Sequence, residues 1–113
     1  MTTMLIQPIS KLLDAVSKNK DTNYLAETDG IIEAYVVDAN EPTTATVLIK
    51  SDGSNPPTTV VKKGIITVAE FSGIAAMPIS YHVKKGNYWR IEDTNVTMRV
   101  INWIPKPSYQ LTI

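Results

Sequence analysis

The side chains with the clearest potential for chemistry lie in YHVKKGNYWRIED, residues 81–93. This stretch holds the chain's one histidine, His82, together with Tyr88 and Arg90. Aromatic side chains among basic ones can bind sugars or single-stranded nucleic acid by stacking and hydrogen bonding. Alternation along a strand would bury Trp89 and turn Tyr88 and Arg90 outward. We therefore consider Tyr88, Arg90 and His82 as a ligand-binding platform, against the simpler interpretation of a solvated strand.

The remaining polar side chains do not form a recognisable catalytic set. A single histidine excludes a cage of histidine ligands, and the absence of cysteine excludes disulfides, thiolate metal sites and cysteine nucleophiles. The chain has no Gly-x-Ser-x-Gly motif and no glycine-rich phosphate-binding motif. Two Asp-Thr-Asn triplets, at 21–23 and 93–95, lack the ligand spacing of a calcium loop and favour Asx turns. We predict no catalytic, cofactor-binding or metal-binding residues, and no enzymatic activity.

Length and composition are typical of one globular domain. The 113 residues are 43% apolar and 19% charged, and their formal net charge is zero. Neutral charge argues against a dedicated nucleic-acid binder, and no apolar run approaches the roughly 18 residues of a membrane span. The first residues lack the features of a secretion signal, so we expect synthesis in a cytoplasm, with no nucleic-acid partner and no membrane insertion.

The elements that must position these side chains are strands. From residue 30 onward, apolar residues recur with a period of two between turn residues, which is typical of an antiparallel β-sandwich. The N-terminal segment PISKLLDAVSKN allows either a short helix or an extended arm. We divide the chain into an arm or helix at 1–22, a β-sandwich at 23–106 and a tail at 107–113. The predicted strands cover residues 31–37, 44–50, 58–62, 65–70, 77–83, 87–92 and 97–104.

The tetrapeptide Val-Lys-Lys-Gly occurs twice, at 61–64 and 83–86. Each copy follows a β-type pattern, so we predict that each ends a strand and that Gly64 and Gly86 form the turns. The lysines would keep these turns solvated and discourage pairing between sheet edges. The sequences flanking the two copies differ, which argues against an internal duplication.

The predicted strands at 31–37 and 97–104 are apolar on both faces. In residues 31–37, the residues Ile31, Tyr35 and Val37 alternate with a second apolar set. A small sandwich needs only one inner face, so the additional apolar face predicts a subunit interface. We expect a homo-oligomer with Ile31, Tyr35 and Val37 at the interface.

Three segments, NYLAETDGIIEAYVV, PISYHVKKGNYWRIE and VINWIPK, together resemble small β-sandwich modules of bacteriophage tail fibres, needle knobs and related virion proteins. The resemblance covers about residues 22–106 and implies a jelly-roll fold, often in three-fold assemblies. It assigns Asp29 and Gly30 to the turn into the first core strand, and Gly86 to the turn before Tyr88. Asn87 and His82 depart from the family pattern, which prefers aspartate and proline at these positions.

This resemblance implies a function without catalysis. We expect a structural or receptor-binding module of a phage or prophage virion, made in the host cytoplasm and acting through oligomeric assembly and loop display. Its partners would be its own copies, as a trimer, other virion proteins and a host-surface glycan. The alternative is a free-standing bacterial carbohydrate-binding module that uses the platform of Tyr88, Arg90 and His82.

Overall fold

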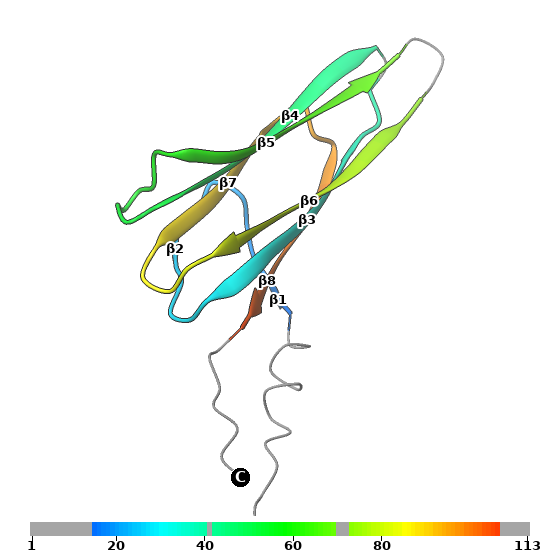
Figure 1. Ribbon diagram of the computed structural model, residues 1–113. Coiled ribbons are helices and arrows are strands. Elements are labelled where there is room, and N and C mark those ends of the chain that lie inside the picture. The colour runs from blue at the N-terminus through cyan, green and yellow to red at the C-terminus, as the bar shows by residue number, and fades with distance from the viewer. Residues whose placement is uncertain (1–14, 41, 70–72, 107–113) are drawn as a thin grey trace, which may run out of the picture.

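The computed structural model describes residues 15–40, 42–69 and 73–106, and these residues form strands and no helix. Two antiparallel sheets, β1-β8-β3-β6 and β2-β7-β4-β5, lie face to face (Figure 1). The predicted all-β antiparallel sandwich is confirmed. The strands are β1 (Val16–Ser17), β2 (Tyr24–Leu25), β3 (Gly30–Asp38), β4 (Thr43–Asp52), β5 (Val60–Val68), β6 (Ala75–Val83), β7 (Tyr88–Thr94) and β8 (Met98–Pro105).

The strand order is that of a jelly roll. β4 pairs with β5, β3 with β6, β2 with β7 and β1 with β8. The chain therefore resembles one long hairpin whose two halves run antiparallel and are wound together into two sheets. This order confirms the predicted jelly-roll-like fold.

Alternation of apolar and polar residues builds the core. In β4, Ala45, Val47 and Ile49 are fully buried, whereas the residues between them are partly exposed. Both sheets turn such residues inward, so the core fills the space between them. The buried apolar cluster consists of Ala26, Ile32, Ala34, Val36, Ala45, Val47, Ile49, Ile66, Ile79, Val83, Trp89, Ile91 and Ile101.

The predicted strands correspond to the observed ones with one exception. The strands predicted at 58–62 and 65–70 are a single strand, β5, and the turn predicted at Gly64 is wrong. Gly64 is buried and pairs with Val47 of β4. A Cβ atom on Gly64 would lie 2.5 Å from Met77 Cε, so glycine here allows the two sheets to approach closely.

Glycine is needed at positions 30 and 86 for different reasons. Gly86 lies between β6 and β7 and has a φ of 93°, a conformation that favours glycine. Gly30 is the first residue of β3, and a Cβ atom there would overlap the indole ring of Trp103. The need for glycine at position 30 therefore comes from the packing of this ring rather than from a left-handed turn.

The described part of the predicted N-terminal arm belongs to the sandwich. Val16 pairs with Trp103, and the Asp21 N–H donates a 2.8 Å hydrogen bond to the Ile91 carbonyl. The chain therefore joins the first sheet and then crosses to the second before residue 23. Residues 1–14, which hold most of the predicted arm or helix, and the predicted tail at 107–113 lie outside the described residues.

A buried carboxylate fastens this crossing segment. The side chain of Asp93 is only 2% exposed and contacts Arg99, with Oδ2 2.5 Å from Nε, and Lys20, with Oδ1 3.3 Å from Nζ. Such pairing offsets the cost of burying a carboxylate. The Asp93 side chain thus binds two cations from β8 and the crossing segment, instead of forming the predicted Asx turn.

The loop between β4 and β5 is organised by Asp52. Its carboxylate accepts hydrogen bonds from the backbone N–H groups of Ser54, Thr58 and Thr59, at 2.8–2.9 Å. These hydrogen bonds favour the ionised form and hold the pKa of Asp52 far below its usual range. The Asn55–Pro56 peptide bond within this loop is cis.

Candidate functional site

The structure does not bring together the three residues of the predicted platform. Trp89 is buried, and Tyr88 and Arg90 point away from it on the outer face of β7. His82 is exposed on the outer face of β6, which belongs to the other sheet. Strands that follow one another in a jelly roll often lie in different sheets. The prediction of one platform formed by Tyr88, Arg90 and His82 is therefore wrong.

The outer face of β7 and β4 carries a network of ion pairs, which we call the charged face: Lys50, Arg90 and Glu92, with Asp21 at its side. Glu92 Oε2 lies 2.7 Å from Arg90 Nε, and Glu92 Oε1 lies 3.0 Å from Lys50 Nζ. Hydrogen bonds from Lys50 and Arg90 lower the pKa of Glu92. Arg90 is thus already engaged within the chain, which leaves it poorly suited to bind a ligand.

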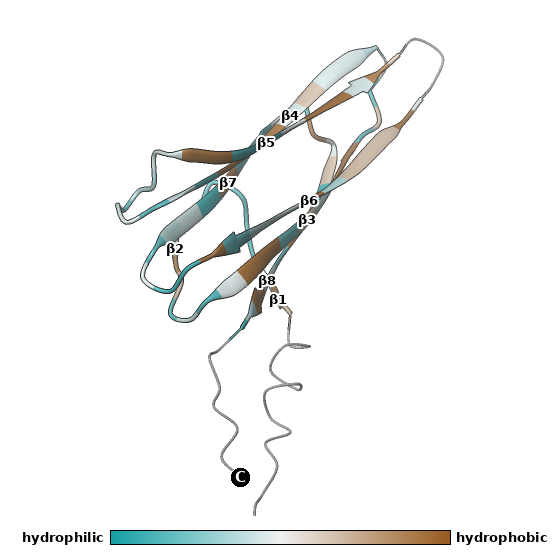
Figure 2. Cartoon of the chain, in the orientation of Figure 1, coloured by the Kyte–Doolittle hydropathy of each residue, from teal (hydrophilic) through white to brown (hydrophobic). Residues whose placement is uncertain are grey.

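The outer face of the other sheet is largely apolar. We call it the apolar face: Ile31, Tyr35, Ala76, Pro78, Met98, Val100 and Ile104. Tyr35 lies between Pro78 and Val100 in the sheet, and the two exposed neighbours Tyr35 and Val100 are 48% and 49% accessible. Figure 2 shows hydrophobic colour over much of β3 and hydrophilic colour over the centre of β7. One row of polar residues crosses the apolar face, and it consists of Glu33, Ser80 and Asn102.

Of the three predicted interface residues, Ile31 is partly exposed and Tyr35 is exposed, but Val37 is buried. Val37 is only 6% exposed, although it points toward the same side of β3 as Tyr35. The turn before β8 is hydrogen-bonded to β3 here, because the N–H and hydroxyl of Thr97 both donate to the Val37 carbonyl, at 2.8 and 3.0 Å. The prediction of Val37 as an interface residue is therefore wrong.

Aromatic rings from both sheets form a column at one end of the sandwich. Trp103 of β8 stacks on Trp89 of β7, with ring centroids 5.5 Å apart and an interplanar angle of 20°. Tyr24 of β2 lies on the other side of Trp89, with centroids 4.8 Å apart. Lys18 Nζ lies 4.7 Å from the centroid of the Tyr24 ring, in a cation–π contact. Gly30 closes the column at the opposite end, beneath Trp103.

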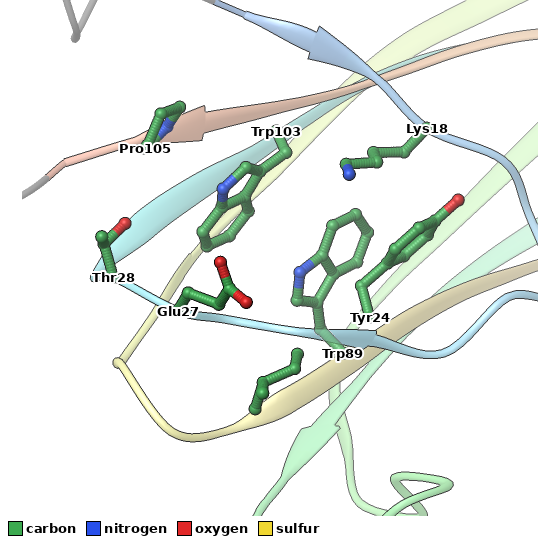
Figure 3. A pocket seen from close by; sticks show the side chains of 8 residues that line it. Lys18, Tyr24, Glu27, Thr28, Trp89, Trp103 and Pro105 are labelled. Carbon is green, nitrogen blue, oxygen red and sulfur yellow. The ribbon is translucent and has the colours of Figure 1, made fainter.

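The edges of these rings line a cleft of about 250 Å³. Figure 3 shows the carboxylate of Glu27 turned toward the two indole rings, with Lys18 on the far side of the cleft. We call this site the aromatic cleft. Its lining residues are Lys18, Tyr24, Leu25, Glu27, Thr28, Trp89, Trp103 and Pro105.

The indole N–H groups of the cleft have no acceptor among the residues that the structure describes. Trp89 is only 1% exposed. It lines the cleft, and Figure 3 shows its indole nitrogen on the side that faces Glu27. By contrast, the Tyr24 hydroxyl already accepts a 2.8 Å hydrogen bond from the Asn19 N–H.

Sequence patterns could not identify this cleft. Strand alternation places Trp89 in the core, but the site depends on the pairing of Tyr24 with Trp89 and on the contact of Trp89 with Trp103 across the two sheets. These contacts join segments far apart in the chain. The signal that was available is the presence of both of the chain's tryptophans at inward positions of separate strands.

In the described parts of the chain, no three acidic or histidine side chains gather where they could hold a metal ion. A search of the same residues finds no helix with the length and hydrophobicity to cross a membrane. No family model matches the sequence, and no curated protein matches it significantly. The resemblance to phage virion modules therefore rests on the sequence motifs alone.

Proposed function

We propose that this chain is a non-enzymatic structural or receptor-binding module of a phage or prophage virion that assembles with its own copies through the apolar face. The observation that supports this proposal is the contrast between the two outer faces of the sandwich. One carries ion pairs that are satisfied within the chain, and the other exposes Tyr35, Met98 and Val100 to about half of their full extent. Exposed apolar patches of this kind mark interaction surfaces.

A second copy of the chain is the occupant that this face fits best. Sheet faces pack well on other sheet faces, and every further copy of the chain supplies an apolar sheet face. Association by strand addition is disfavoured at two of the four sheet edges, because β5 and β6 carry Lys62, Lys63 and Pro78, which are typical of protected edges. Completing the burial of each half-exposed side chain would contribute about 1 kcal/mol.

The sequence resemblance supplies the finer parts of the proposal, which are the virion location, the three-fold symmetry and the partners. In a trimer the apolar faces would surround the three-fold axis, so that each copy contacts both neighbours. The loops at the ends of the sandwich would then remain free for other virion proteins or a host-surface glycan. The absence of nucleophile motifs from the sequence supports a role without catalysis.

The test is the molar mass in solution, measured by light scattering after size-exclusion chromatography at two protein concentrations. We expect three times the mass of one chain at both concentrations. Tyr35→Arg should yield a monomer, because it places an unpaired charge in the interface. Thr46→Arg, a matched substitution on the outer face of β4, should leave the mass unchanged.

Each other outcome has a defined meaning. A wild-type monomer at both concentrations would overturn the proposed assembly. A dimer that Tyr35→Arg disrupts would support association through the apolar face and overturn the three-fold symmetry. An oligomer disrupted by Thr46→Arg but not by Tyr35→Arg would move the interface to the charged face.

A further inference from the structure

We infer that the aromatic cleft binds a neutral, hydroxyl-rich ligand, of which a single hexose unit of a glycan is the representative. This inference goes beyond the proposed assembly, because the cleft lies at the end of the sandwich between β2 and β8, away from the apolar face. It also replaces the platform of Tyr88, Arg90 and His82 with a different set of residues.

The Trp89 N–H is a hydrogen-bond donor at the cleft. The N–H of a largely buried tryptophan usually has a hydrogen-bond partner. Trp89 is almost fully buried and lines the cleft, and no hydrogen bond joins its N–H to a described residue. An oxygen atom of a bound ligand would complete this hydrogen bond.

The cleft carries charged groups of both signs. Glu27 and Lys18 stand on its opposite sides, so an anionic ligand would meet a carboxylate and a cationic ligand would meet an ammonium group (Figure 3). A hydroxyl group can donate to Glu27 and accept from Lys18 or from an indole N–H. The Thr28 hydroxyl, which donates to the Asp29 carbonyl at 2.8 Å, remains able to accept. Several neighbouring hydroxyls on one ligand match this arrangement.

The size of the cleft and the apolar part of its lining also suit a sugar ring. Leu25 and Pro105 line the cleft beside the indole edges, and they can contact the C–H groups of a sugar ring. The volume of about 250 Å³ lies below the range of about 300–1,000 Å³ typical of drug-sized ligands. Because Gly30 and Trp89 cover the two faces of Trp103, a ligand meets ring edges, and we expect a dissociation constant on the order of 1 mM per sugar unit.

The experiment follows the indole N–H groups directly by nuclear magnetic resonance. The chain has two tryptophans, so its spectrum contains two indole N–H signals. The wild-type protein would be titrated with glucose, galactose, mannose and N-acetylglucosamine. At least one of these sugars should shift both signals in a saturable way. Glu27→Gln should weaken the binding of that sugar about tenfold.

Two further variants separate this inference from the proposed assembly. Glu33→Gln removes an exposed carboxylate from the apolar face and should leave sugar binding unchanged. Tyr35→Arg, designed to give a monomer, should also bind the sugar as the wild type does. Indole signals that do not move with any of the four sugars, or that move equally in Glu27→Gln, would overturn the inference while leaving the assembly proposal intact.

Discussion

The two copies of Val-Lys-Lys-Gly have the same sequence and different structures. The copy at 61–64 lies within β5, where Gly64 is buried between the sheets. The copy at 83–86 ends β6, and Gly86 is exposed in a turn with a φ of 93°. The same glycine thus serves close packing in one place and an unusual backbone conformation in the other. Four residues do not determine which of these roles a glycine takes.

The neighbours of each copy explain the difference. Gly64 is followed by residues that continue the alternation, and it faces Met77 of the opposite sheet. At the second copy the chain crosses from one sheet to the other, and the segment between β2 and β3 holds the turn by hydrogen bonds. The Lys85 N–H donates to Asp29 Oδ1 and the Gly86 N–H donates to the Ala26 carbonyl, both at 2.8 Å.

The largest expected effect is that of a side chain at Gly64. Gly64→Val would place its Cβ atom 2.5 Å from Met77 Cε, the flexible end of that side chain, and 3.0 Å from Val47 Cγ1. Because its two methyl groups add to this crowding, the free energy of unfolding should fall by about 2–3 kcal/mol. Urea denaturation at a fixed protein concentration measures this change. Gly53→Val is the control, because a Cβ atom at Gly53 would meet nothing within 4 Å. Equal losses at both positions would contradict the packing role of Gly64.

At Gly86 the expected loss is smaller and has a different residue preference. Gly86→Ala should lower the free energy of unfolding by about 1–2 kcal/mol, because alanine is strained at positive φ, although there is open space around the position. Gly86→Asn should cost less than Gly86→Ala, since asparagine tolerates this conformation. At Gly64 the order should be reversed, with asparagine worse than alanine. The same order at both positions would show that the two glycines serve one purpose.

The smallest expected effect concerns pH and the loop that precedes the first copy. The folded-state pKa of Asp52 is lowered, so its carboxylate stabilises the fold above the unfolded-state pKa of about 3.9, and this contribution is lost as the pH falls below that value. We expect wild type to melt a few degrees above Asp52→Asn at pH 7, and the gap to narrow below about pH 4. Thermal unfolding followed by circular dichroism at a series of pH values tests this, and a constant gap would contradict it.

Sequence patterns were informative where one strand can be considered by itself. The alternation in β7 correctly places Trp89 in the core. The patterns failed where the answer depends on a distant segment. Gly64 looked like a turn because Met77, which needs the space beside it, lies in another strand. Val37 looked exposed because its neighbours Ala76 and Met98 lie in other strands, which pair with β3 on its two sides.

The same limitation applies to the candidate sites. His82 and Tyr88 are six positions apart in the chain and lie on opposite outer faces, because the turn between them crosses from one sheet to the other. The apolar character of both faces of β3 was visible in the sequence, since it depends on that strand alone. The aromatic cleft was not visible, because it combines β2, β7 and β8 with the segment before β2.

The nested pairing of the jelly roll also sets the order in which the fold can be completed. β4 and β5 are adjacent in the chain and can pair as soon as both have been synthesised, whereas β1 must wait for β8. Until β8 leaves the ribosome, β3 lacks the neighbour on one of its two sides. The edge of β3 that pairs with β8 therefore stays unpaired longest during synthesis. This edge belongs to the sheet with the apolar outer face, so this sheet is the part of the nascent chain most exposed to wrong strand pairing.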